Sequence, residues 1–264
     1  MKYKNSLIKG KSKIAVWGTG YIGLSTMAYF SKKKIKCVGF DIDSEKVKKI
    51  NKGILPIPEL RNWFGFNIKK SVRQKYLSAT NNFYDLINSN FVAHFIAIPT
   101  EKDGKPYFDA LFDVLRKIIK LKKINFKLIP IVIIESTLTP KFSENKILPF
   151  LKKNNIKIGK DLLYAVAPRR DWFVEGTKSI VDIDRVYGST DQQSSKIVGE
   201  ILSIVCKKLH QASSHRVSEM VKSIENAYRH MEITLANQLS LAYPGENMRE
   251  VLQLVGTKWN IGTF

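Results

Sequence analysis

The feature that most constrains this chain is KIAVWGTGYIGLS, residues 13–25, in which an apolar run breaks into three glycines spaced G-x-G-x-x-G. The pattern predicts a buried strand, a tight turn and the start of a helix, which together form the cradle for a dinucleotide pyrophosphate. In such a cradle Gly18 permits the turn, Gly20 lets the pyrophosphate approach the backbone, and Gly23 lets the helix pack closely on the strand.

A second predicted strand ends in GFDID, which places Asp41 18 residues beyond Gly23. A carboxylate there accepts hydrogen bonds from the adenine ribose hydroxyls and repels a 2′-phosphate. We therefore predict that the chain binds NAD in preference to NADP, with Lys46 as a nearby opposing charge. Tyr21 and Ile22, between the second and third glycines, complete the predicted cofactor-binding segment.

Short apolar, β-branched runs alternate with helical patterns along most of the chain. The runs are IAVWG (14–18), KCVGF (36–40), FVAHFIAIP (91–99), PIVIIES (130–136), LLYAVAP (162–168) and RVYG (185–188). Parallel strands need crossover connections and become buried on both faces, so this alternation predicts an α/β fold with a Rossmann-like, doubly wound parallel sheet.

The pattern changes after residue 212, where apolar residues recur at three- and four-residue steps. They predict one continuous helix over residues 213–243, which ends before Pro244. At roughly 1.5 Å per residue it would extend ~45 Å. We therefore expect an NAD-binding Rossmann-like domain over residues 1–212 and a central helical dimerisation domain, truncated, over residues 213–264.

The chain carries 44 basic and 23 acidic residues, a formal net charge of +21. Such a charge favours anionic partners, but the lysines are scattered through amphipathic segments and no basic stripe is interleaved with aromatic residues. No apolar stretch reaches 18 residues, and the N-terminus has no apolar signal-peptide core. We predict a cytoplasmic protein with no nucleic-acid partner and no membrane contact.

Cys37 and Cys206 are the two cysteines, each inside an apolar run. They argue against a disulfide framework, fit a reducing compartment, and are interpreted as small hydrophobic core residues. The four histidines are dispersed, so no metal-ligand spacing emerges and we predict no metal site.

The sequence contains, in this order, the blocks GTGYIGLS, DIDSEKVKKINKGILPIPEL, IAIPTEKDGKPYFDAL, ESTLTP and EMVKSIENAYRHMEITLANQLS. Together they cover nearly the whole chain and resemble the UDP-glucose/GDP-mannose dehydrogenase family, the nucleotide-sugar 6-dehydrogenases that oxidise a sugar CH₂OH group to a carboxylate with two NAD. The resemblance implies a nucleotide sugar, UDP-linked, as substrate, a role in polysaccharide biosynthesis and a homodimer through the central helix.

The resemblance also implies roles for individual residues. Thr100 and Thr137 would lie along the cofactor, and Glu175 would approach its nicotinamide side. Lys222 and Asn226 would hold the sugar and stabilise the oxygen of the carbon from which hydride leaves. These last two residues are four positions apart and share one helix face, where an ammonium and an amide can stabilise a developing alkoxide or a tetrahedral intermediate.

Two departures from the family pattern stand out. In VAPRRDWFVEG, Arg169 follows Pro168 where the family carries a glutamate. Either Asp171 supplies that carboxylate or Arg169 binds a sugar phosphate, and the sequence leaves both open. The family's nucleophilic cysteine lies in a glycine-rich loop after the central helix, and the chain stops at GTKWNIGTF, before that loop and the C-terminal nucleotide-sugar-binding domain. We therefore expect a chain that binds NAD but is inactive or incomplete alone.

Two alternative functions remain at this stage. A two-electron dehydrogenase of the hydroxyacid type also uses a helix lysine followed by an asparagine and needs no cysteine, although PIPEL and ESTLTP count against it. A non-enzymatic NAD-binding or dimerisation module is the other.

Overall fold

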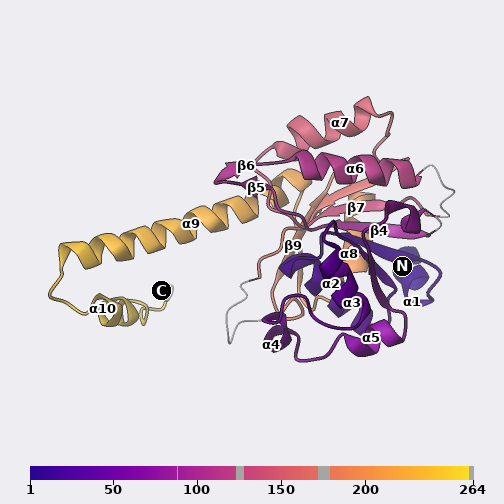
Figure 1. Cartoon of the computed structure of the whole chain (residues 1–264). Coiled ribbons are helices and arrows are strands. Elements are labelled where there is room, and N and C mark those ends of the chain that lie inside the picture. The colour runs from indigo at the N-terminus through magenta and orange to yellow at the C-terminus, as the bar shows by residue number, and fades with distance from the viewer. Residues whose placement is uncertain (88, 123–127, 172–178, 262–264) are drawn as a thin grey trace. The chain divides into compact units, whose positions relative to one another are not determined.

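The structure is a computed structural model that describes residues 1–87, 89–122, 128–171 and 179–261 (Figure 1). It divides into two compact units, Met1–Met220 and Val221–Phe264. None of the helices within the described ranges is long and apolar enough to cross a membrane.

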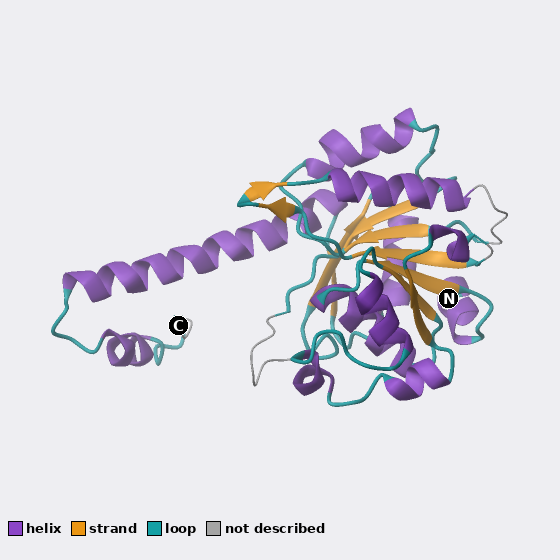
Figure 2. Cartoon of the chain, in the orientation of Figure 1, coloured by secondary structure: helices purple, strands orange, loops and turns teal. Residues whose placement is uncertain are grey.

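Within the described residues, the first unit is built on an eight-stranded sheet in the order β10-β9-β8-β7-β4-β1-β2-β3 (Figure 2). The strands are β1 (Lys13–Trp17), β2 (Cys37–Phe40), β3 (Leu77–Thr80), β4 (Phe91–Ile96), β7 (Ile131–Ile134), β8 (Leu163–Val166), β9 (Arg185–Ser189) and β10 (Leu209–Gln211). Neighbouring strands are parallel except β8 and β9, which are antiparallel. The predicted Rossmann-like α/β fold is confirmed, with strand order reversing between β1 and β4.

Helices cover both faces of this sheet (Figure 1). They are α1 (Lys2–Ile8), α2 (Tyr21–Lys32), α3 (Ser44–Asn51), α4 (Leu60–Phe64), α5 (Lys69–Arg73), α6 (Asp109–Lys122), α7 (Leu148–Lys153) and α8 (Gln192–Leu202), with a 3₁₀ helix at Phe83–Leu86 and a π-helical turn at Ser143–Ile147. A two-stranded hairpin joins β5 (Glu101–Lys102) and β6 (Lys105–Pro106).

The side chains of β1 alternate between two hydrophobic clusters, as the two-residue period of a strand requires. Ile14 and Val16 belong to the cluster that includes α2 and α8, whereas Ala15 and Trp17 belong to the one that includes α6 and α7. Burial on both faces explains why the strand is apolar from Ile14 to Trp17.

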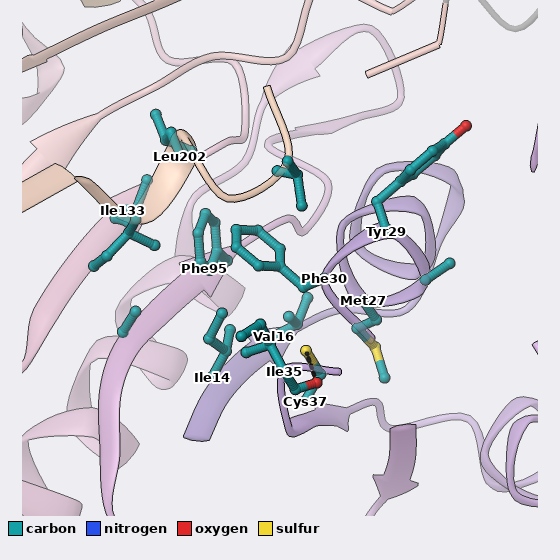
Figure 3. Close-up of a cluster of buried hydrophobic side chains, with 14 of the residues drawn as sticks. Ile14, Val16, Met27, Tyr29, Phe30, Ile35, Cys37, Phe95, Ile133 and Leu202 are labelled. Atoms are coloured by element: carbon teal, nitrogen blue, oxygen red, sulfur yellow. Dashed lines mark hydrogen bonds between the residues drawn. The ribbon is translucent and has the colours of Figure 1, made fainter. Parts of the chain in front are cut away.

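Figure 3 shows part of the first cluster, in which Phe30 of α2 lies against Phe95 of β4, with their ring centroids 5.4 Å apart. Cys37 is buried in the same cluster, and Cys206 is buried as well. Both thiols are free, and burial raises the pKa of each. Their interpretation as small core residues is confirmed.

A continuous 28-residue helix, α9 (His215–Ala242), starts in the first unit and is followed by α10 (Met248–Val255). It agrees with the long helix predicted from the apolar periodicity. The buried carboxylate of Glu219 in its first two turns accepts hydrogen bonds from the backbone N–H groups of Phe142 and Ser143, at 2.8 and 3.1 Å, and from the Ser143 hydroxyl. Glu219 thereby satisfies donors at the start of the π-helical turn.

Candidate cofactor-binding site

Two of the three glycines are required by the protein itself. Gly18 has φ +87°, and a Cβ there would lie 2.6 Å from the carbonyl oxygen of Ala97. A Cβ on Gly23 would lie 1.9 Å from the carbonyl oxygen of Gly18. Both positions therefore exclude a side chain, one by its left-handed backbone and crowding, the other by the close approach of α2 to β1.

Gly20 is different, because a Cβ there would meet nothing within 4 Å. It is the N-cap of α2, with an extended backbone (φ −70°, ψ −165°) that other residues also adopt. The protein alone does not need glycine at this position. The open space lies in front of the start of α2, before Tyr21 and Ile22, where a helix favours an anion such as a pyrophosphate.

Asp41 follows β2 and is 9% exposed. Its Oδ2 accepts hydrogen bonds from the backbone N–H and the hydroxyl of Thr19, both at 2.7 Å, and its Oδ1 accepts one from the N–H of Asp43 at 3.0 Å. The carboxylate thus ties the glycine turn to the end of β2. Lys46 pairs with Asp43, at 3.6 Å, so its charge is countered by a different carboxylate.

The ends of β4 and β7 lie beside this turn. The hydroxyl of Thr100 donates to the carbonyl oxygen of Thr137 at 2.6 Å. The Ser136 hydroxyl joins the same two segments, since it accepts from the N–H of Ile98 at 3.0 Å and donates to its carbonyl oxygen at 2.7 Å. The structure therefore brings Thr100 and Thr137 together at the carboxyl edge of the sheet, where strand order reverses and α/β proteins bind ligands. Ser136 lies in the EST block but was not among the predicted site residues.

A buried ion cluster lies behind the turn, formed by Glu135, Arg169, Asp171 and Arg185. Nη2 of Arg185 donates to Glu135 and to the carbonyl oxygen of Ala167, both at 2.5 Å. Burial alone would raise the pKa of the Asp171 carboxyl, but the guanidinium of Arg169 beside it brings that pKa below its ordinary value. No local pattern in the sequence predicts this cluster.

Arg169 and Asp171, the residues of the two roles considered at this position, bond to each other. Arg169 is 4% exposed, and its Nε and Nη2 donate to the two oxygens of Asp171. In the described structure neither side chain presents a free charge to solvent. The two side chains bond to each other, and Arg169 also bonds to α2.

Three predicted site residues remain: Glu175, Lys222 and Asn226. Glu175 lies outside the described residues. Lys222 and Asn226 are four residues apart on α9, in the second unit, with Lys222 half-buried and Asn226 exposed. Their roles stay predictions.

Comparison with known proteins gives the same architecture. Residues 12–206 match the NAD binding domain of the UDP-glucose/GDP-mannose dehydrogenase family, and residues 216–264 match its central domain. Protein CapL of Staphylococcus aureus is 30% identical over 257 residues, covering 95% of this chain and 57% of CapL. The UDP-N-acetyl-D-mannosamine dehydrogenase of Pyrococcus horikoshii is 29% identical over 249 residues, covering 93% and 57%.

A solved structure of the UDP-D-ManNAc dehydrogenase from Pyrococcus horikoshii aligns with a TM-score of 0.82 at 29% identity, covering 96% of this chain and 59% of that one. The chain therefore spans a little over half the length of these relatives.

Alanine substitutions at Gly23 and Gly20 distinguish a glycine that the packing requires from a glycine that leaves space for the cofactor. We expect Gly23→Ala to cost about 3 kcal/mol of unfolding free energy, at the upper end for overpacking, because its Cβ meets a backbone carbonyl. We expect Gly20→Ala to change stability by less than about 0.5 kcal/mol but to weaken NAD binding about tenfold, because its Cβ enters the open space before α2. Urea unfolding and calorimetric titration measure the two effects. Unchanged NAD affinity in Gly20→Ala would contradict this assignment of the open space.

Proposed function

Because this chain belongs to the UDP-glucose/GDP-mannose dehydrogenase family, we propose that it is the NAD-binding and central-helix part of a dehydrogenase that oxidises a nucleotide sugar. The observation that carries the proposal is the cradle of Gly18, Gly20 and Gly23 with Asp41 beside it. Relatives at 29% identity are dehydrogenases of UDP-N-acetyl-D-glucosamine and UDP-N-acetyl-D-mannosamine, so the substrate class is a UDP-N-acetylhexosamine. The match to both domains favours this function over a hydroxyacid-type dehydrogenase.

The described residues fit NAD, which when bound supplies the hydride acceptor. The start of α2, at Gly20, Tyr21 and Ile22, holds the pyrophosphate, and Asp41 accepts hydrogen bonds from the adenine ribose. Thr100 and Thr137, at the carboxyl edge of the sheet, would lie along the cofactor, and the family resemblance assigns Glu175 to its nicotinamide side.

Lys222 and Asn226 are the proposed groups for the sugar. The resemblance assigns them to this role, and their spacing on α9 supports it, since residues at i and i+4 share a face. An ammonium and an amide that converge on the reacting oxygen would stabilise the alkoxide that forms when the hydroxyl loses its proton, from whose carbon hydride then leaves. The proposed domain boundary at residues 212–213 is supported by the family matches, which end at residue 206 and resume at residue 216.

The proposed location is the cytoplasm, on the evidence of two cysteines in separate apolar runs.

The cofactor preference tests the first part of the proposal. We expect NAD to bind more tightly than NADP, and Asp41→Ala to lose about 1.5–3 kcal/mol of NAD binding, the worth of a charge-assisted hydrogen bond. Calorimetric titration with both cofactors measures this.

Thr19→Val is the matched control, because it removes one hydrogen bond to Asp41 but keeps the carboxylate. It should retain the preference for NAD. Equal affinities for NAD and NADP in the wild type, or unchanged NAD binding in Asp41→Ala, would refute the assignment.

Turnover tests the second part. The family's second oxidation proceeds through a covalent sulfur intermediate, and the thiols of Cys37 and Cys206 are both buried with raised pKa values, which suppresses the thiolate. We therefore expect that these 264 residues, mixed with NAD and a UDP-N-acetylhexosamine, do not give sustained formation of two NADH per sugar. NADH absorbance follows the reaction. Two NADH per sugar that persist in Cys37→Ser and Cys206→Ser would show that the mechanism is misassigned.

We also propose that two copies associate through α9. Large apolar side chains are exposed along α9 and beyond it: Ile224, Tyr228, Met231, Ile233, Leu235, Leu241, Leu254 and Trp259. Exposed apolar surface of this kind favours association.

A charge introduced on the apolar face tests the association. We expect Leu235→Lys to shift the sedimentation coefficient toward the monomer, because a lysine is costly to bury at an apolar contact. We place the contact on the face of α9 that carries Ile224, Tyr228, Met231 and Leu235. Asn237→Lys adds the same charge about 200° around the helix, beside Ile233 and Leu241, and should leave the dimer intact. A wild-type chain that sediments only as a monomer at high concentration would contradict the dimer.

A further inference from the structure

Arg169 connects the segment after β8 to the cofactor helix. Its Nη1 donates to the Thr26 hydroxyl at 2.6 Å and to the Ile22 carbonyl oxygen at 3.4 Å, and its Nη2 donates to the Ser25 hydroxyl at 3.0 Å. Ser25 and Thr26 are fully buried. All three acceptors lie in the first two turns of α2, the helix whose start faces the open space at Gly20.

These acceptors share one face of α2. Positions 22, 25 and 26 fall within about 100° of the helix circumference, because successive residues turn by about 100°. A rigid fork that bonds all three restricts rotation of the helix about its axis. That rotation decides where the first N–H groups of α2 point, and therefore how well they meet an anion.

Arg169 is itself held firmly from the other side. Asp171 accepts hydrogen bonds from Nε and Nη2 of Arg169 at 2.5 and 2.8 Å. The backbone N–H of Arg169 donates to the Glu135 carbonyl oxygen at 3.3 Å. Glu135 accepts in turn from Thr26, at 2.7 Å, and from Arg185. The cluster pairs two guanidinium groups with two carboxylates, so its charge is balanced, and a buried charge is stable only with such partners.

We propose that Arg169 is a positioning residue for the pyrophosphate of NAD, which acts by fixing the rotation of α2. The inference rests on the proposed NAD binding of this chain. Arg169 does not reach the ligand itself, because it is buried and its donors are directed at α2 and Asp171. The planar fork of arginine is what bonds several acceptors at once, and lysine cannot reproduce it with a single ammonium.

The test compares NAD with adenosine, which carries no phosphate. We expect Arg169→Lys to raise the Kd for NAD about tenfold, on the scale of one charge-assisted hydrogen bond, and to leave the Kd for adenosine unchanged. Ser25→Ala removes one acceptor of the fork and should raise the NAD Kd about threefold, again without an effect on adenosine. Calorimetry measures NAD binding, NMR titration measures adenosine binding, and thermal unfolding measures the stability of each variant.

Arg185→Lys is the matched control, because Arg185 belongs to the same cluster but donates to Glu135 and Ala167 and not to α2. It should lower stability while the NAD Kd stays at the wild-type value. A selective loss of NAD binding in Arg169→Lys and Ser25→Ala, but not in Arg185→Lys, supports the proposal.

Three results overturn it. One is wild-type NAD affinity in folded Arg169→Lys, and another is an equal loss of NAD and adenosine binding in that variant. The third is an equal loss of NAD binding in Arg169→Lys and Arg185→Lys, which would mean a purely structural role. If Arg169→Lys does not fold, Ser25→Ala decides, and unchanged NAD affinity there refutes the proposal. A wild-type chain that does not bind NAD would instead refute the proposed function, and this inference with it.

Discussion

The close packing of α2 on β1 is the contact on which the cofactor site depends. A Cβ at Gly23 would lie 1.9 Å from the Gly18 carbonyl oxygen, so the helix reaches this distance only because Gly23 has no side chain. That approach fixes where α2 begins, and the beginning of α2 fixes the N–H groups that favour an anion. Thr19 lies in the same short turn and is held by Asp41, so the pyrophosphate end and the ribose end of the site are built from one set of contacts.

The topology of the sheet also distributes the charges. In a parallel sheet with crossover helices, the helices begin at the carboxyl edge of the strands and end at the amino edge. Asp43 accepts hydrogen bonds from N–H groups at the start of α3, while Lys49 and Lys153 lie in the last turns of α3 and α7. Helix dipoles favour both arrangements. Part of the net charge of +21 is thus explained by solvated lysines at helix ends, without a polyanionic partner.

The elements that the sequence predicts correctly are those with a local physical cause. Gly18 and Gly23 are needed for steric reasons that the spacing alone reveals, and each of the six apolar runs overlaps an observed strand. β3 and β10 were missed, because their sequences, LSAT and LHQ, contain polar residues and form no apolar run. The antiparallel direction of β9 was missed as well, since an apolar run predicts a strand but not its direction.

Arg169 shows why the rest of the site needed the structure. The family pattern has a glutamate at this position, so the sequence alone indicates that a carboxylate is missing. No neighbouring residue contradicts that interpretation. Its acceptor Thr26 lies 143 positions earlier in the chain, and no local pattern pairs residues so far apart. The effect of a buried charge depends on whether every one of its partners is present. Asp171, two residues on, and the hydroxyls of α2 supply those partners here, so the same substitution that removes a carboxylate from the pattern adds a support to the cofactor helix.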